Sequence, residues 1–144
     1  MGFFNNTKLK TINKMNKTFK NFSLKEKAKR NCVFIHVNFA GGDADTEHPE
    51  EYILPGITME NIDDHFVRVS KEIEDFRILK KILDNADDDS NYDMIKAEYG
   101  VEIAKLYMDT PNDPQCDYQN KCYIDRIELH AYDDNGDLYI QHVG

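Results

Sequence analysis

The chain has 144 residues, of which 40% are hydrophobic, and a formal net charge of −9 at pH 7. This length suits one domain with a buried core, and the negative charge opposes binding to nucleic acid or to anionic membranes. An odd number of cysteines (Cys32, Cys116 and Cys122) and the absence of an apolar secretory segment predict a reducing, cytoplasmic setting.

The charge is divided unevenly along the chain. Residues 1–30 contain nine basic side chains and one acidic one, whereas residues 31–144 contain nine basic and 26 acidic side chains. The sequence therefore predicts a basic N-terminal arm, residues 1–30, joined to a single acidic domain, residues 31–144. Apolar residues recur in the arm at helical spacing, with lysines between them. Such an arm suits a membrane surface, a nucleic acid or an acidic partner, or it docks on the body.

The first predicted strand covers residues 32–39, CVFIHVNF. Alternate residues, from Val33 to Phe39, are apolar, and the opposite face is partly apolar as well, so the strand is expected inside a sheet. A loop over residues 41–51, GGDADTEHPEE, begins at the glycine pair and ends near Pro49. A short second strand is expected at residues 51–56.

The loop over residues 41–51 gathers the polar residues Asp43, Asp45, Glu47 and His48. Carboxylates at alternate positions of a loop suit Ca²⁺ or Mg²⁺, and such loops also carry catalytic groups. Exposed carboxylates equally suit water or a basic partner. We interpret the loop as a partner-binding or solvated surface, with an unrecognised hydrolase site as the alternative.

The segment HVNFAGGDADTEHPEEY, residues 36–52, resembles a strand and loop of small uncharacterised bacteriophage accessory proteins. The resemblance covers these residues alone. It implies a protein of a mobile element that acts by binding a host factor, and it assigns no catalytic residue.

The clearest predicted helix begins near residue 62, with Thr58 or Asn61 as its cap. Its predicted buried stripe consists of Ile62, Phe66, Val69, Ile73, Phe76, Leu79 and Leu83. A second helix is expected from about Ser90. Gly100 weakens this helix, and residues 101–108 suit either a helix or a strand.

Residues 87–98 match the ligand spacing of an EF-hand loop. Its oxygen ligands would be Asp87, Asp89, Asn91, Asp93 and Glu98. The match departs at the sixth position, where Tyr92 replaces the glycine of the sharp turn. A Ca²⁺-binding module is therefore an alternative function.

The C-terminal residues predict a hairpin around Asp-Asp-Asn-Gly, residues 133–136. Ile127, Leu129 and Ala131 share one face, and Leu138 and Ile140 are expected to return on that face. The five histidines show none of the spacings of known metal sites. The predicted fold is α+β, an antiparallel sheet of about four strands with two helices packed on one face.

These features indicate a binding protein rather than an enzyme, because no segment matches a catalytic motif. The acidic body predicts a small interaction protein that binds a basic host protein, such as a nucleic-acid-binding enzyme, in the manner of a phage inhibitor. Direct binding of nucleic acid by the body is not expected.

Overall fold

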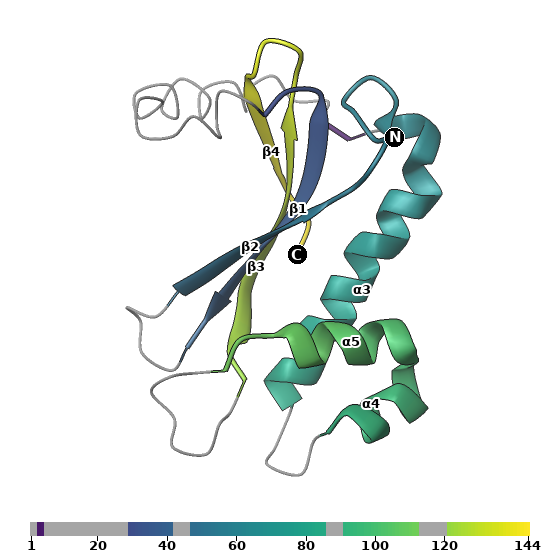
Figure 1. Ribbon diagram of the computed structural model, residues 1–144, viewed down its shortest axis with the longest axis vertical. Helices are drawn as coiled ribbons and strands as arrows, with labels where there is room; N and C mark the ends of the chain where they lie inside the picture. Colours follow the sequence, from purple (N-terminus) through teal and green to yellow (C-terminus); the bar gives the residue numbers. More distant parts are fainter. Residues whose placement is uncertain (1–2, 5–28, 42–46, 86–90, 113–120) are drawn as a thin grey trace. The chain divides into compact units, whose positions relative to one another are not determined.

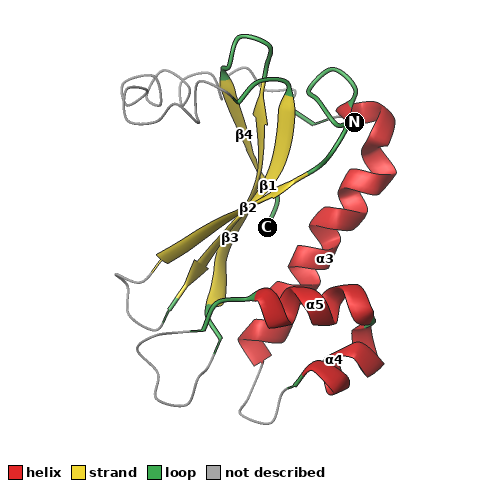
Figure 2. Ribbon diagram, viewed as in Figure 1, coloured by secondary structure: helices red, strands yellow, loops and turns green. Residues whose placement is uncertain are grey.

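The computed structural model describes residues 3–4, 29–41, 47–85, 91–112 and 121–144. The described residues form an α+β fold with a four-stranded antiparallel sheet and three α-helices (Figures 1 and 2). The strands follow the order β2-β1-β3-β4 across the sheet. Both the fold class and the number of strands confirm the expectation from the sequence.

The strand β1, Cys32–Ala40, lies inside the sheet, between β2 and β3. Val33, Ile35, Val37 and Phe39 are buried, as their alternation predicts. On the other face Phe34 and His36 are half-buried, and Asn38 is buried. Both faces of the strand are thus shielded, which is typical of an interior strand.

The strand β2, Glu47–Ile53, begins four residues before the strand expected at residues 51–56. The prediction of a loop through residue 51 is therefore wrong from Glu47 onward. Pro49 led to that prediction, because proline cannot donate a backbone hydrogen bond to a neighbouring strand. β2 lies at an edge of the described sheet, where such a residue is tolerated.

The hairpin joins β3, Tyr123–Tyr132, to β4, Leu138–His142. The Asp133 carboxylate accepts hydrogen bonds from the backbone N–H groups of Asn135 and Asp137, each at 2.9 Å. Gly136 adopts a φ of 81°, which favours glycine. The predicted turn is confirmed.

The prediction that Leu138 and Ile140 of β4 share a face with Leu129 is wrong. Leu138 lies opposite Tyr132 and Ile140 opposite His130, so both share the face of His130 rather than that of Leu129. The five loop residues between the strands set this register, and a shift of one residue reverses every side chain.

The long helix α3, Phe66–Asn85, follows a 3₁₀ turn, η3, at Ile62–His65. The predicted residues Ile62, Val69, Ile73, Phe76 and Leu79 are all buried. Phe66 is instead 44% exposed, with its ring stacked on Phe3 at 5.3 Å. A 3₁₀ turn advances about 3.0 residues per turn rather than about 3.6, so the apolar stripe shifts where η3 meets α3. At the other end Ile82 is buried, whereas Leu83 is half-buried.

Two short helices, α4 (Tyr92–Tyr99) and α5 (Val101–Asp109), stand where one helix was expected, so the described helices number three. Gly100 separates them with a φ of 102° and a ψ of 168°, and the helical reading of residues 101–108 is confirmed. The two helices pack together, and Ile95, Ile103 and Tyr107 on them are buried. The N-cap of α4 is Asn91, whose side chain accepts a hydrogen bond from the Met94 N–H at 3.0 Å.

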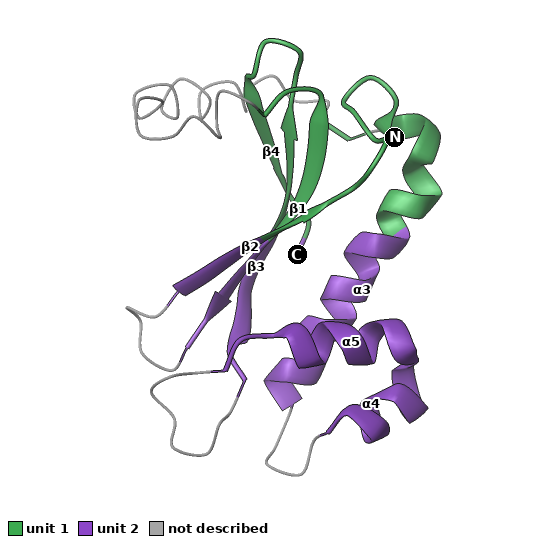
Figure 3. Ribbon diagram, viewed as in Figure 1, with its two compact units in different colours: residues 1–36, 51–70, 128–143 green, residues 37–50, 71–127, 144 purple. Residues whose placement is uncertain are grey.

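The chain divides into two compact units (Figure 3). Unit 1 comprises Met1–His36, Glu51–Ser70 and Glu128–Val143, and its buried residues include Val33, Ile62 and Leu129. Unit 2 comprises Val37–Glu50, Lys71–Ile127 and Gly144, and its buried residues include Phe39, Leu79 and Ile127. The expected division into an arm and a single domain stays a prediction. Most of the arm lies outside the described residues.

None of the helices in the described part of the chain is both long and apolar enough to cross a bilayer.

Candidate functional site

The acidic segment predicted to bind a partner is described only from Glu47 onward. Asp43 and Asp45 lie outside the described residues, whereas Glu47 and His48 open β2 and belong to unit 2. Glu47 and Glu50 are exposed. The His48 Nε2 atom is buried and has no hydrogen-bond partner among the described residues. The described part of this segment is therefore an acidic strand end, and its role in partner binding stays a prediction.

The predicted calcium ligands are described in part as well. Asp87 and Asp89 lie outside the described residues, and the Asn91 side chain accepts the N-cap hydrogen bond of α4. The helix begins at Tyr92, where an EF-hand loop has its glycine. Asp93 and Glu98 are exposed on α4. Calcium binding stays a prediction, with one ligand already serving as a helix cap.

Replacement of Asn91 by alanine tests these two roles. Loss of the N-cap acceptor is expected to lower the free energy of unfolding by about 0.5–2 kcal/mol, measured by urea denaturation without calcium. The control Glu98→Gln is expected to leave this free energy within about 0.5 kcal/mol, because Glu98 is exposed. If millimolar Ca²⁺ stabilised the wild type but neither variant, the EF-hand interpretation would be correct instead.

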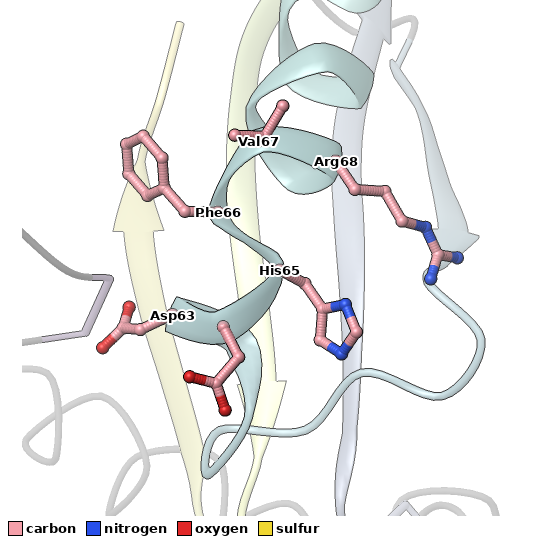
Figure 4. A pocket seen from close by; sticks show the side chains of 6 residues that line it. Asp63, His65, Phe66, Val67 and Arg68 are labelled. Carbon is pink, nitrogen blue, oxygen red and sulfur yellow. The ribbon is translucent and has the colours of Figure 1, made fainter.

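A surface pocket lies at the start of α3, within unit 1, and is lined by Asp63, Asp64, His65, Phe66, Val67 and Arg68. The Asp63 carboxylate accepts a hydrogen bond from the Phe3 N–H, and Arg68 donates to the Pro55 carbonyl. Figure 4 shows Asp63 and Phe66 pointing to one side of the turn and His65 and Arg68 to the other. Because these side chains diverge, the pocket does not assemble a constellation of reactive groups.

The described cysteines are Cys32 and Cys122, and both are free thiols. Cys122 is buried in unit 2. Burial raises the pKa of the half-buried Cys32 thiol, and the nearby Lys29 lowers it by a smaller amount. A raised pKa keeps the thiol protonated near neutral pH, and the thiolate is the nucleophilic form. Cys32 is therefore not set up as a nucleophile.

The most concentrated set of chemically active side chains lies on one face of the sheet in unit 1. We call it the histidine cluster, and it consists of His36 on β1, Glu128 and His130 on β3, and His142 on β4. Glu128 and His130 are two residues apart on one strand and therefore share a face. The hairpin register places His142 directly opposite Glu128.

The polar atoms of the cluster lie close together. His130 Nε2 is 3.0 Å from Glu128 Oε1, and His142 Nε2 is 3.4 Å from Glu128 Oε2. The His36 and His130 rings are stacked with their centroids 4.5 Å apart and their planes within 4° of parallel. One ligand atom from each of His36, Glu128 and His130 can be chosen so that all three lie within 4.8 Å of one another.

Two side chains of the cluster, those of Glu128 and His130, are largely shielded from solvent, whereas that of His142 is exposed. The exposed fraction of the side chain is 11% for His130 and 13% for Glu128, but 71% for His142. Burial of a carboxylate costs free energy unless hydrogen bonds or a positive charge compensate it. Here the imidazoles of His130 and His142 supply the contacts, so this arrangement can hold a proton or a cation beside Glu128.

Sequence reasoning missed the histidine cluster. The Glu-x-His spacing at residues 128–130 was visible, and strand alternation places both side chains on one face. His36 and His142 join the cluster only because of which strands are neighbours and in which register they pair. The spacing of residues along the chain does not reveal either.

Comparison of the chain with models of known protein families, with curated proteins and with solved structures found no match. The resemblance to bacteriophage accessory proteins therefore stays a prediction.

Proposed function

We propose that this protein is a small acidic interaction protein that binds a basic protein partner. The observation that carries the proposal is the distribution of exposed carboxylates over the described elements. Exposed acidic side chains occur on β2, on η3 and on each of the three described helices. The negative electrostatic field of these carboxylates attracts a positively charged surface and accelerates its association with this protein.

The segment that we assign to the partner contact contains Asp43, Asp45, Glu47 and His48. Its described part lies on an edge strand, where Glu47 and Glu50 project into solvent. Rows of carboxylates imitate the charge of a phosphate backbone, so a nucleic-acid-binding enzyme is the class of partner that fits. Inhibition of such an enzyme is the expected consequence, as in a phage-type inhibitor.

The basic arm, residues 1–30, carries the opposite charge to the body. A polybasic segment of this kind suits a nucleic acid or an anionic membrane surface. We infer that the arm and the body act on different partners, with the helices and sheet of the body supplying the acidic surface.

Binding is expected to fall steeply with salt. The screening length shrinks from about 30 Å at about 0.01 M salt to about 8 Å at about 0.15 M, so a distributed field is largely lost. Partners are first captured from a bacterial lysate at low salt. The triple variant Asp43→Asn, Asp45→Asn, Glu47→Gln is then expected to slow association with the captured protein about tenfold, with a similar dissociation rate.

The matched control removes the same charge elsewhere in unit 2, with Asp93→Asn, Glu98→Gln and Asp109→Asn on α4 and α5. It is expected to slow association much less, because those carboxylates lie outside the assigned contact. Equal slowing in both variants would remove residues 43–48 from the contact and leave only a general charge effect. Association that is insensitive to salt would refute the electrostatic proposal.

A further inference from the structure

We propose that the histidine cluster is a binding site for a divalent transition-metal ion, with Zn²⁺ as the ion that fits best. The proposed ligands are His36, Glu128 and His130, and His142 holds the Glu128 carboxylate from the solvent side. All four belong to unit 1, so the site does not depend on how the two units are arranged. It is independent of partner binding, because none of these residues lies in the segment assigned to the partner contact.

The donor atoms select the class of ion. Ca²⁺ and Mg²⁺ prefer sites made of oxygen ligands, whereas imidazole nitrogens suit zinc and the neighbouring transition metals. Two imidazoles and one carboxylate make a mixed nitrogen and oxygen set, which zinc accepts with a further ligand or a water completing a tetrahedron. The cluster therefore differs in chemistry from the oxygen-rich segment at residues 87–98.

The distance between His130 and Glu128 matches this geometry. Zinc binds nitrogen and carboxylate oxygen at about 2.0–2.2 Å, which places two ligands of a tetrahedron about 3.3 Å apart. His130 Nε2 is 3.0 Å from Glu128 Oε1, whereas His142 Nε2 lies 3.4 Å from the other carboxylate oxygen, Oε2, and orients the carboxylate. The ligand atoms of His36, Glu128 and His130 lie within 4.8 Å of one another, and one of the two parallel imidazole rings turns when both bind the same ion.

Electrostatics favours a cation at this position. The Glu128 carboxylate is 13% exposed and contacts two histidines. A dication bound here would neutralise this carboxylate and accept lone pairs from the imidazole nitrogens.

The position of each ligand in the sheet indicates what the ion does. The ligands come from the neighbouring strands β1 and β3, so the ion would link these strands across the face of the sheet. His142 on β4 is 71% exposed and lies beside Glu128 at the solvent side. Because the ion would join two strands, we assign it a stabilising role in unit 1.

The test is a calorimetric titration of the full chain, produced without a polyhistidine tag and cleared of metal with a chelator. With Zn²⁺ the wild type is expected to bind a single ion and to melt at a higher temperature. Glu128→Gln keeps the size and the hydrogen-bonding oxygen, and His142→Gln changes an exposed side chain. Each is expected to weaken zinc binding by at least about tenfold and to remove most of the rise in melting temperature.

The control is His65→Gln, which changes a histidine in unit 1 outside the cluster and is expected to leave zinc affinity unchanged. If Glu128→Gln fails to fold, His142→Gln decides the result. Absence of zinc binding by the wild type, or equal affinity in all variants, would overturn the proposal. A strong near-ultraviolet thiolate band with Co²⁺ would also overturn it, because the ion would then lie on cysteine.

Discussion

Replacement of Phe39 by alanine is expected to lower the free energy of unfolding by about 3–5 kcal/mol, the largest effect of any single substitution considered. Phe39 is fully buried and is among the largest fully buried side chains of the described residues. Truncation removes its buried apolar surface and leaves a cavity that close-packed neighbours fill only in part. Domains are stable by only about 5–15 kcal/mol, so this loss approaches complete unfolding.

Urea denaturation followed by circular dichroism measures this change. The control is Val67→Ala, because Val67 is 83% exposed, and its effect is expected to stay within about 0.5 kcal/mol. If the Phe39 variant lost less than about 1 kcal/mol, Phe39 would have to be accessible to water, and the interior position of β1 would be wrong.

Replacement of Gly100 by alanine is expected to lower the free energy of unfolding by about 1–3 kcal/mol. Gly100 combines a φ of 102° with a ψ of 168°, a conformation that is essentially reserved for glycine. A Cβ atom built at Gly100 meets no heavy atom within 4 Å. The expected loss therefore comes from the backbone alone and not from a steric contact with a neighbour.

The matched control is Glu98→Ala, an exposed change two residues earlier on α4, with an expected effect within about 0.5 kcal/mol. A stabilised Gly100 variant would contradict the prediction. Alanine favours a helix over glycine by about 1 kcal/mol, so stabilisation would show that α4 and α5 can merge into one continuous helix.

The elements that the sequence predicted well are those whose patterns are local. The alternation of Val33 through Phe39, the turn residues 133–136 and the apolar stripe of α3 each depend on neighbours within a few positions. The weakening of the second helix predicted at Gly100 is a local effect as well, because a glycine interrupts a helix through its own backbone freedom. These elements were sufficient to predict the α+β class and the four strands.

Other predictions failed where tertiary context overrides a local rule. Pro49 indicated a loop, but an edge strand tolerates proline. Phe66 matched the buried stripe of α3, yet the preceding 3₁₀ turn shifts it to the surface. The face of Ile140 depended on the hairpin register, which the turn residues alone did not determine.

By itself the sequence determined the charge of the body, the acidic segment at residues 43–48 and the oxygen ligands proposed at residues 87–98, since these are runs of neighbouring residues. The tertiary structure alone brought His36 and His142 to Glu128 and His130. More than ninety positions separate His36 from Glu128 along the chain, so only the pairing of β1 with β3 makes them neighbours. A histidine and a carboxylate are common residues at any one position. They acquire metal-binding chemistry only when strand order and register place their ligand atoms a few ångströms apart, because coordination acts over contact distance and is insensitive to order along the chain.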